Sequence, residues 1–545
     1  MKKRIISVLL AMIVGCSLLS GCGGNEGKSN NDNDNDNGER VTLSIGIPQN
    51  SNVTSYEDNA FTKYIEDSLN IDLEFVFFSS STSENTQQIS LMVSGNQELP
   101  DVLLGFWEMS QSMTNDFGED GYFIDLTEPL EKYAVNFWKQ MDTLDEDMQD
   151  YIMKKGTNSV DGDFYSMPFV IERVQDDIGC MTYINKNWLD KLNLSIPTNI
   201  DELYTVLKAF ATQDPNGNGE ADEIPMVSAA RGMYDITAYI INAYEYFDNI
   251  NPYYVEGDKV VEAAATDEYR QALIYANKLC KEGLFSDLSF TITATNEFLS
   301  LITPADNIAR VGIWAGHPAI MTDSASTILD QYVALPALGD ATGKGGYQVV
   351  REPSIKFSSA MITKDCKNVE AAVKLLDFFY QDEAVSRMRH GEKGVDWLDQ
   401  EGSNDYGEPS HIEIVNANAF FKGNSTWGRN MTGILNSYNY LANAVAGTGR
   451  TAEVSRLGSE TWQLVKNAKL PEKNVSYLLY TEDEESVKSE KEELYLSAIL
   501  EQRALFITGD ANPGDDAAWD AYLNTLKKQG GAELLKVKQD AYNRK

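Results

Sequence analysis

The fold is decided by the stretch "VTLSIGIP" (Val41–Pro48) together with the sixty residues after it. This stretch alternates and then runs apolar, which predicts a strand. An amphipathic helix, "AFTKYIEDSLNI" (60–71), and a second strand, "IDLEFVFF" (71–78), come next. "ISLMVSGNQELPDVLLGFW" (89–107) then predicts a helix, a break at residues 95–100 and a buried strand. The order strand, helix, strand, helix, strand implies a parallel sheet with helices on its faces.

The rest of the chain contains the same two kinds of element. "DGDFYSMPF" (161–169) predicts a hairpin and a crossover, and "GCMTYINKNWLDKLNL" (179–194) a strand leading into a helix. "PTNIDELYTVLKAFATQ" (197–213) is the clearest helix, with Thr198 as its cap and Asp201 at the third position. Helical spacing of apolar residues predicts two late helices, one starting after Asn368 and one within residues 515–530.

The N-terminus has the layout of a secretory signal. A charged start (Lys2, Lys3 and Arg4) precedes an apolar run over 5–19 that ends in "LSGC" (19–22). The run is too short, and too abruptly followed by polar residues, for a durable membrane span. Residues 1–21 are therefore predicted to be a signal peptide. Residues 22–40 are predicted to be a flexible tether, because the segment after its cysteine has no apolar residue with which to offset its ordering entropy.

Composition excludes several classes of partner and site. The formal net charge of −38 makes nucleic acid and anionic lipid surfaces poor partners. After the predicted signal peptide and residue 22, the cysteines are Cys180, Cys280 and Cys366. Their odd count and their spacing fit neither a disulfide scaffold nor a zinc site, so we interpret them as small buried residues.

The loop "QDPNGNGEADEIP" (213–225) carries oxygen-bearing residues at alternate positions around two glycines. With Asp214 as position 1, the pattern agrees with an EF-hand calcium loop through position 9, including the glycine at position 6. Position 12 is Pro225 in place of the bidentate glutamate, so a complete EF-hand is excluded and Glu223 is expected to supply that carboxylate. The predicted Ca²⁺ ligands are Asp214, Asn216, Asn218, Glu220 (through its backbone carbonyl), Asp222 and Glu223.

The alternative for this loop is a solvated turn without an ion, since Asp, Asn and Gly populate turns anyway. No histidine is near it in sequence, and nothing resembles a general base aimed at an open coordination site. The ion is therefore expected to be structural: it would lower the entropy of a long loop and stabilise the part of the fold that holds this loop.

The chain resembles a known family, the extracellular solute-binding lipoproteins of Gram-positive bacteria, which are receptors of ABC sugar importers. The resemblance covers most of the chain after the signal peptide. In "GEKGVDW" (391–397) the family often has histidine where Asp396 stands, which puts any role of that position in doubt. The matching stretches are "LSGCG", "LPDVLLG", "YSMPF", the run from Tyr183 to Pro225, "RVGIWAG", "RHGEKGVDW" and the tail from Phe506 onward.

The resemblance implies an α/β, two-lobed periplasmic-binding-protein fold of the large type II. Each lobe is a mostly parallel sheet flanked by helices, and the lobes hinge around a central cleft that closes on the ligand. Residues 41–168 plus about 300–355 are expected to form the N-terminal lobe, and residues 169–299 plus 356–545 the C-terminal lobe. The closed form is expected to be a monomer that the permease subunits of an ABC transporter recognise. Related sugar receptors carry a calcium loop of this shape, which favours the ion.

The "LSGC" ending also resembles a bacterial lipobox, in which the cysteine is diacylated and becomes the first residue of the mature protein. Cys22 is the predicted lipid anchor, and Cys16, inside the apolar run, is a weaker competitor. The alternative is a soluble secreted protein. With the anchor, the protein would be held at the extracellular face of the cell membrane.

Sugars are usually bound by aromatic rings together with acidic, amide and arginine side chains. In open α/β sheets such groups gather beyond the carboxyl ends of the strands. The candidates follow predicted strands, the calcium loop or the glycine-rich "GEKGVDW". They are Trp107, Glu108, Glu172, Arg173, Arg231, Tyr234, Trp314, His317 and Trp397.

Two other functions stay open. A secreted glycoside hydrolase would use two carboxylates flanking a cleft, and 83 acidic residues cannot exclude such a pair. The same fold could also bind a peptide, because fold does not fix the ligand. We predict a binding protein without catalytic residues.

Overall fold

The computed structural model describes residues 40–158, 160–173, 177–230, 234–317, 327–340, 345–416, 419, 423–444 and 450–545. The predicted signal peptide, Cys16, Cys22 and the tether up to residue 39 lie outside the described residues, as does Arg231.

Strand β1 (Val41–Pro48) forms as predicted and organises a six-stranded sheet. Its alternate side chains Leu43, Ile45 and Ile47 are almost completely buried. It pairs in parallel with β2 (Ile71–Phe78) on one side and with β3 (Val102–Leu104) on the other. Helix α1 (Ala60–Leu69) connects β1 to β2 and is capped by the side chain of Asn59. The predicted parallel arrangement is therefore confirmed.

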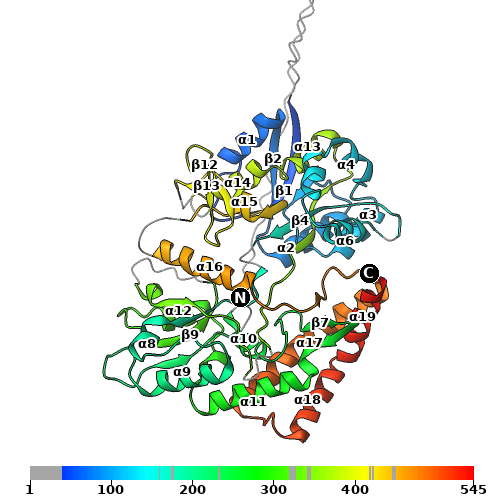
Figure 1. The fold of residues 1–545 in the computed structure, drawn as a ribbon. Coiled ribbons are helices and arrows are strands. Elements are labelled where there is room, and N and C mark those ends of the chain that lie inside the picture. Colours follow the sequence, from blue (N-terminus) through cyan, green and yellow to red (C-terminus); the bar gives the residue numbers. More distant parts are fainter. Residues whose placement is uncertain are drawn as a thin grey trace, which may run out of the picture. The chain divides into compact units, whose positions relative to one another are not determined.

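The first sheet has the order β14-β4-β11-β3-β1-β2, and its strands β1, β2 and β4 are labelled in Figure 1. Its later strands are β4 (Met167–Glu172), β11 (Ser354–Ile362) and β14 (Gly433–Asn436). Strand β11 is antiparallel to both of its neighbours, β3 and β4, and the remaining pairings are parallel. Apolar side chains from residues 43–170 and 360–440 form the core of this sheet, the first core.

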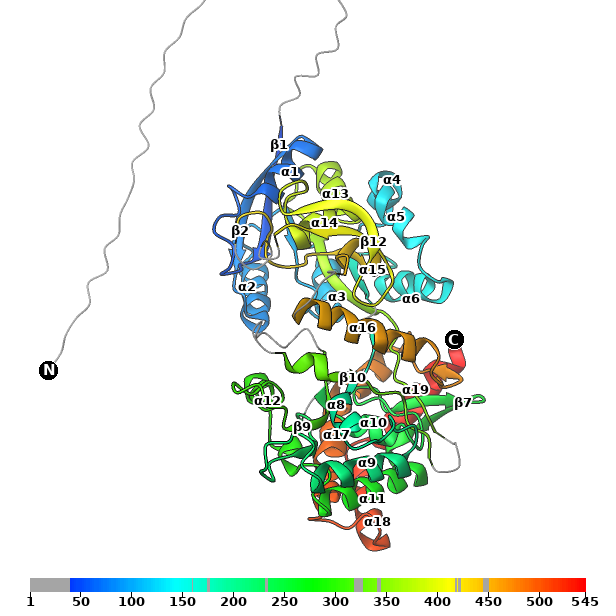
Figure 2. The same cartoon turned by 60° about the vertical axis from the view of Figure 1, so that its left-hand side comes forward.

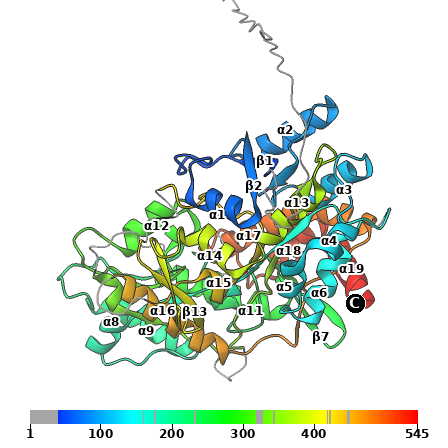
Figure 3. The same ribbon diagram turned by 90° about the horizontal axis from the view of Figure 1, so that it is seen from above.

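Helices and a hairpin surround the first sheet, with hairpin β12–β13 beside α15 (Figures 2 and 3). The elements are α2 (Thr82–Ser94), α3 (Gln111–Glu119), α4 (Thr127–Tyr133), α5 (Val135–Met141), α6 (Glu146–Gly156), α13 (Val369–Phe378), α14 (Asp382–His390), β12 (Trp397–Ser403), β13 (Pro409–Ile414) and α15 (Ser437–Tyr440). Asn368 caps α13, as its predicted start requires.

The second sheet has the order β10-β5-β9-β6. Its strands are β5 (Thr182–Asn185), β6 (Ile224–Met226), β9 (Val311–Ala315) and β10 (Tyr332–Ala334). Strand β5 is antiparallel to β10 and β9, and β6 is parallel to β9. A small sheet of β7 (Tyr253–Glu256), β8 (Lys259–Glu262) and β15 (Lys473–Asn474) lies in the same part of the chain.

The second core contains residues from 178–338 and from 454–541, and Tyr406 from the β12–β13 hairpin also belongs to it. In it, α11 packs against α17, and α17 packs against α18 and α19 (Figure 1). The helices are α8 (Lys186–Lys191), α9 (Ile200–Thr212), α10 (Thr237–Ile241), α11 (Asp267–Lys281), α12 (Thr295–Ile302), α16 (Arg450–Lys466), α17 (Glu482–Thr508), α18 (Asp516–Lys528) and α19 (Gly531–Arg544), with short 3₁₀ turns at Ala263–Ala265, Asp287–Phe290 and Ile328–Gln331. The cap of α9 is Asn199, which accepts from the backbone of residues 201 and 202. The prediction of Thr198 was one residue early, because its hydroxyl instead donates to Glu202.

The two sheets share one rule: the reversed strand in each is the one that the chain enters from the other sheet. Strand β5 follows β4 of the first sheet, and β11 follows β10 of the second. The predicted lobe boundaries are therefore wrong for two segments. Strand β9 belongs with β5 rather than with β1, and β11 and β14 belong with β1. Apolar periodicity identifies a strand, but it does not say which sheet the strand joins.

Two of the connecting segments lie side by side. Ile178 and Val350 form an antiparallel bridge, with Gly179 N donating to Val349 O (3.0 Å) and Arg351 N to Asp177 O (2.7 Å). The guanidinium of Arg351 pairs with the buried Asp248 carboxylate. The two segments that connect the first sheet to the second are thereby hydrogen-bonded to each other, and the ion pair with Asp248 attaches them to the part of the chain that forms the second core.

Across the described ranges, no helix is both long enough and apolar enough to cross a bilayer. Cys180, Cys280 and Cys366 are free thiols; Cys180 is buried and the other two are half-buried. Their interpretation as buried residues holds fully only for Cys180.

Candidate functional site

A cavity of about 540 Å³ is lined by residues that belong to both parts of the fold. Glu172 ends β4 and Asn436 ends β14, so both come from the carboxyl ends of strands in the first sheet. Trp462 comes from α16, which packs against the second core. The other lining residues are Asp177, Glu408, Pro409, Ser437 and Tyr438. A space lined from both sides by aromatic and polar groups is the general form of a small-molecule site.

The polar groups of this cavity are held in place by neighbouring side chains. The Trp462 indole donates to Glu408 Oε1 (2.5 Å), which also pairs with Lys466. The Tyr438 hydroxyl donates to Glu401, and the Tyr438 ring stacks on His411 with centroids 4.7 Å apart. Burial raises the pKa of Glu172, and the charge of Asp145 raises it further.

A second group of side chains, which we call the arginine–aromatic cluster, includes residues next to the cavity lining in sequence: Arg173 follows Glu172, and Tyr440 is in the same short helix as Ser437. The Arg173 guanidinium lies over the Tyr440 ring, 4.5 Å from its centroid. The Trp107 indole donates to the backbone carbonyl of Asn430 (3.3 Å). The cluster consists of Trp107, Arg173, Arg389, Arg429, Asn430 and Tyr440.

His317 lies close to this cluster. Its Nε2 is 2.7 Å from the hydroxyl of the buried Tyr406. Burial lowers the pKa of His317 to about 4, and the positive charge of Arg173 adds to the effect. His317 is therefore a neutral imidazole at pH 7, available for hydrogen bonding and not for ion pairing. Trp107, Glu172, Arg173 and His317 are the predicted ligand candidates that the structure brings together.

Two of the predicted tryptophans are core residues. The Trp314 ring is 0% exposed and lies between Tyr183 (centroids 4.6 Å apart) and Tyr332 (5.9 Å). The prediction was wrong because β9 extends through Ala315, which leaves Trp314 inside the strand and not after it. Trp397 is also 0% exposed, and its indole donates to Gly391 O (2.9 Å). The turn that begins at Gly391 thus covers the ring from solvent.

The other candidates lie apart from the cavity. Glu108 is exposed and accepts a hydrogen bond from Thr82. Tyr234 packs against Phe298, with centroids 6.0 Å apart, and against Gly316. Asp396, the position where the family often has histidine, is buried and accepts from Glu392 N and from the Asn416 amide. Its contacts are those of a structural loop residue.

Sequence reasoning missed Arg389, Arg429, Asn430, Tyr440, Tyr438 and Trp462. Arg389 lies in a predicted helix next to other charged residues, and Arg429 lies in a loop without a motif. Nothing in the local pattern separates them from surface residues, because their meeting depends on the packing of distant segments.

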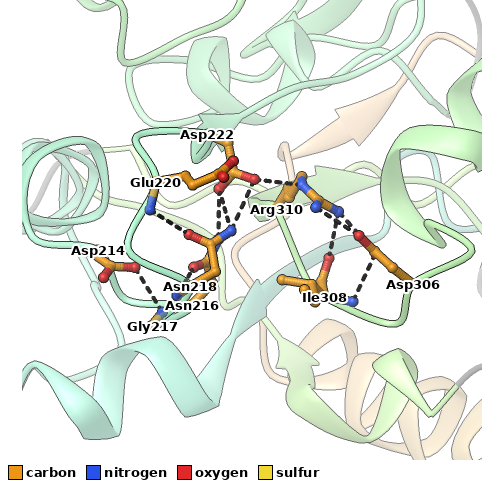
Figure 4. A network of polar contacts seen from close by, with 9 residues as sticks. All are labelled: Asp214, Asn216, Gly217, Asn218, Glu220, Asp222, Asp306, Ile308 and Arg310. Carbon is orange, nitrogen blue, oxygen red and sulfur yellow. Dashed lines mark hydrogen bonds and ion pairs between the residues drawn. The ribbon is translucent and has the colours of Figure 1, made fainter.

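The loop over 213–225 folds as a series of tight turns around Asp214, which accepts from the backbone N of Gly217 (2.8 Å; Figure 4) and also from that of Gly219 (3.2 Å). Both glycines have positive φ, at 79° and 81°, which a residue with a Cβ rarely adopts. Asn216 Oδ1 and Asn218 Oδ1 each accept from a backbone N two residues further on. The spacing predicted from the sequence is therefore built into a compact loop.

Two cations of the protein lie against the same loop. Arg310 donates to Asp222 Oδ2 (2.6 Å) and, in a bidentate pair, to Asp306 (Figure 4). The amides of Asn216 and Asn218 also donate to Asp222. Lys191 Nζ donates to the carbonyls of Asp214 and Pro215 (3.1 Å each). Asp222 is thus already neutralised and saturated, which sets it apart from the other predicted ligands.

Glu223 provides the observation that favours a cation here. Its Oε1 is buried without a hydrogen-bond partner. Burial raises the pKa of Glu223, and the nearby Asp214 and Asp222 raise it further. Among the described residues, no group of three or more His, Cys, Asp and Glu side chains is placed to hold a metal ion. A site in this loop would therefore depend on amide and backbone oxygens as well as on Asp214 and Glu223, which suits calcium.

The two α/β sheets, their reversed strands and the cavity define a periplasmic-binding-protein-like fold, as predicted. Residues 50–386 match the family described as bacterial extracellular solute-binding proteins, and the chain belongs to this family. Proteins of this family bind solutes and do not transform them, so the prediction that the protein is not an enzyme is confirmed and the hydrolase alternative falls away.

Curated relatives match most of the chain at low identity. The fructooligosaccharide ABC transporter substrate-binding protein FusA of Streptococcus pneumoniae is 25% identical over 461 residues, 82% of this chain and 80% of its own. Lipoprotein LipO of Bacillus subtilis is 26% identical and covers 74% of this chain and 76% of its own. The polygalacturonan/rhamnogalacturonan-binding protein YtcQ of the same organism is 25% identical and covers 72% and 74%.

Solved structures show the same fold over nearly the whole chain. An ABC-transporter-associated solute-binding protein from Bifidobacterium longum infantis, described as HMO-binding, superposes with a TM-score of 0.69 at 21% identity and covers 92% of this chain and 99% of its own. An EF-hand mutant of FusA in complex with fructo-nystose superposes with a TM-score of 0.66 at 21% identity, with the same two coverages.

Proposed function

We propose that this extracellular solute-binding protein is a lipid-anchored receptor that captures an oligosaccharide in a cleft between two lobes and hands it to the permease of an ABC transporter. In this proposal one lobe comprises residues 41–173 and 354–444, and the other residues 177–340 and 450–545. The observation that carries it is the 540 Å³ cavity, to which β4, β14 and α16 contribute side chains. Closing the lobes on a ligand that touches both sides would convert binding into a recognisable shape.

The chemistry of the cavity favours a saccharide over a peptide. Its aromatic side chains, Tyr438 and Trp462, offer apolar surface, and Glu172, Asp177, Glu408 and Asn436 offer acceptors for hydroxyl groups. FusA and YtcQ, whose names give a saccharide as the substance bound, support the same ligand class.

The test is calorimetric titration of the purified protein with a panel of oligosaccharides and oligopeptides, followed by recovery of the ligand. We expect one saccharide bound per chain, recovered unchanged, with a rise in melting temperature as binding linkage requires. Binding of peptides alone, or recovery of cleaved saccharide, would overturn the proposal.

We further propose that the loop over 213–225 binds one structural Ca²⁺ through Asp214, Asn216, Asn218, the Glu220 carbonyl and Glu223. Asp222 orients Asn216 and Asn218 through their amides and is balanced by Arg310. The unpartnered Oε1 of Glu223 is the observation that supports this set. The solved structure of FusA described as an EF-hand mutant supports a calcium loop in this family.

Removing calcium measures this directly. If the ion is present at 100 times its Kd, chelation is expected to lower the free energy of unfolding by about 3 kcal/mol. The variant Glu223→Gln, which keeps the shape but removes a carboxylate, is expected to melt like the chelated protein and to respond little to added calcium. Identical melting of the wild type with and without chelator would contradict the site.

The anchor is proposed at Cys22, in line with the lipoprotein relative LipO. Metabolic labelling with a palmitate analogue is expected to mark the wild type and not the variant Cys22→Ala. Retained labelling in that variant would move the anchor to another cysteine, with Cys16 tested next.

A further inference from the structure

We propose that the saccharide bound by this protein carries carboxylate groups, and that the arginine–aromatic cluster receives at least one of them. The inference rests on the proposed function and specifies its ligand class. The cluster is assembled from segments that are far apart in sequence, following β3, following β4, within α14, before β14 and within α15.

The cluster is continuous. The Arg429 guanidinium lies over the Trp107 ring, with Cζ 5.0 Å from the ring centroid. Trp107 donates to the Asn430 carbonyl (3.3 Å), and the Asn430 amide donates to the Tyr440 hydroxyl (3.4 Å). The guanidinium groups of Arg173 and Arg389 both lie over the Tyr440 ring, with their Cζ atoms 4.5 and 5.2 Å from the ring centroid, respectively. Aromatic faces hold planar guanidinium groups in fixed orientations, so three donors of the same kind are preorganised in one place.

Elsewhere this protein neutralises its buried arginines. Arg503 pairs with Asp235, and Arg351 forms a bidentate pair with Asp248. Arg429 differs, because no carboxylate of the described residues lies within ion-pair distance of it. The carboxylate whose charge acts on the pKa of Arg429 is that of Glu108, and Glu108 itself accepts a hydrogen bond from Thr82. In a chain with a net charge of −38, a half-buried guanidinium without an ion pair is a costly exception.

The electrostatic environment agrees with this geometry. Burial lowers the pKa of Arg429, and the carboxylate of Glu108 offsets only part of that effect. Burial also lowers the pKa of Arg389, and the positive charge of Arg173 adds to it. Both directions mean that the surroundings disfavour positive charge. An anion placed among these groups would relieve that cost.

Open hydrogen-bonding atoms mark where a ligand would bind. Arg429 Nε and Asn430 Oδ1 are both buried without a hydrogen-bond partner. A neighbouring guanidinium N–H and amide oxygen match a carboxylate oxygen and a sugar hydroxyl, respectively. Phosphate would also suit arginine, but the Trp107 ring and the adjacent cavity suit a sugar ring that carries its acid, a uronate.

The acids of the adjacent cavity restrict where that charge can lie. Glu172, Asp177 and Glu408 line the cavity and would repel a second carboxylate there, while they can accept from hydroxyl groups. The ligand is therefore expected to present its acid to the cluster and its hydroxyl groups to the cavity.

The experiment is calorimetric titration of the mature protein with trimers of galacturonate, glucuronate and mannuronate, each compared with its carboxyl-reduced neutral counterpart. We expect at least one acidic trimer to bind about 10- to 100-fold more tightly than its neutral counterpart, with affinity falling as salt rises. If neutral saccharides bind as well or better, the inference is overturned while the proposed function stands. If no saccharide in the wider panel binds, the proposed function fails and the inference with it.

Variants locate the effect. Arg429→Gln and Arg389→Gln are each expected to lower affinity for the acidic trimer about 10- to 100-fold, to leave the neutral counterpart within about twofold, and not to lower the melting temperature. The matched control is Arg387→Gln on the same helix, because Arg387 is already paired with Glu383 and its loss should not alter affinity. Full affinity for the acidic trimer in both cluster variants would overturn the assignment.

Discussion

In the loop over 213–225 the Asp222 carboxylate is paired with a cation of the protein, whereas the arginine–aromatic cluster holds Arg429 without an ion pair. In the loop, Asp222 is neutralised by Arg310, and Lys191 caps the carbonyls of Asp214 and Pro215. In the cluster, guanidinium groups lie on Trp107 and Tyr440. Asp222 thus has a counter-ion among the described residues, and Arg429 does not.

The difference separates a feature that serves the fold from a feature that serves a ligand. The loop is formed within about a dozen residues, so its contacts are almost complete before any ligand arrives. The cluster draws on five segments and keeps one donor, Arg429 Nε, and one acceptor, Asn430 Oδ1, open, which costs stability and is retained at binding sites.

Replacing Tyr440 by alanine would have the largest effect, because this ring supports two guanidinium groups and is itself 5% exposed. We expect a loss of about 3–5 kcal/mol in the free energy of unfolding, measured with urea, and loss of detectable binding of the acidic trimer. The matched variant Tyr438→Ala, on the same short helix but 39% exposed, should cost less than about 1 kcal/mol. Equal losses for the two would mean that Tyr440 is not a structural support of the cluster.

His317 tests the cluster through pH. Its pKa is lowered from 6.5 to about 4 in the folded protein, so the unfolded chain takes up this proton first as the pH falls. The free energy of unfolding therefore has its full value with respect to His317 above pH 6.5. It falls progressively as the pH falls toward 4, by at most about 3 kcal/mol. Between these pH values the wild type should lose stability relative to His317→Gln in urea unfolding. A constant difference between the two proteins would show that His317 is not held neutral.

Arg310→Gln addresses the loop and should have the smallest effect. Losing the partner of Asp222 is expected to lower the melting temperature slightly, because this pair is partly solvated, and to leave ligand affinity unchanged. The comparison would break down if Arg310→Gln weakened ligand binding as strongly as Arg429→Gln does.

Periodicity and local motifs predicted the features that depend on neighbouring residues. Strand β1, its parallel partners, the capped helix α13 and the turns of the loop all form where expected, because each is determined within a short segment. The assignment of β9 and β11 to their sheets was wrong, since a buried strand carries no mark of its partner. Trp314 was misplaced for a related reason, since whether a tryptophan lies within a strand or beyond it depends on where the strand ends. Trp397 was misplaced because the fold of the glycine turn before it buries the ring. Arg429 and Tyr440 could not have been paired from sequence at all.

Strand β2 forms one edge of the first sheet, and an exposed edge strand affects whether copies of the protein that lie close together aggregate. Its sequence, "IDLEFVFF", combines four large apolar residues in a row with an unpaired backbone edge, the composition from which strand-to-strand aggregation starts. Val76 and Phe77 are each 37% exposed. Asp72 and Glu74 interrupt the first half of the strand with negative charge, so two copies approaching edge to edge would repel each other. The acidic character of the chain thus also protects it from its own neighbours.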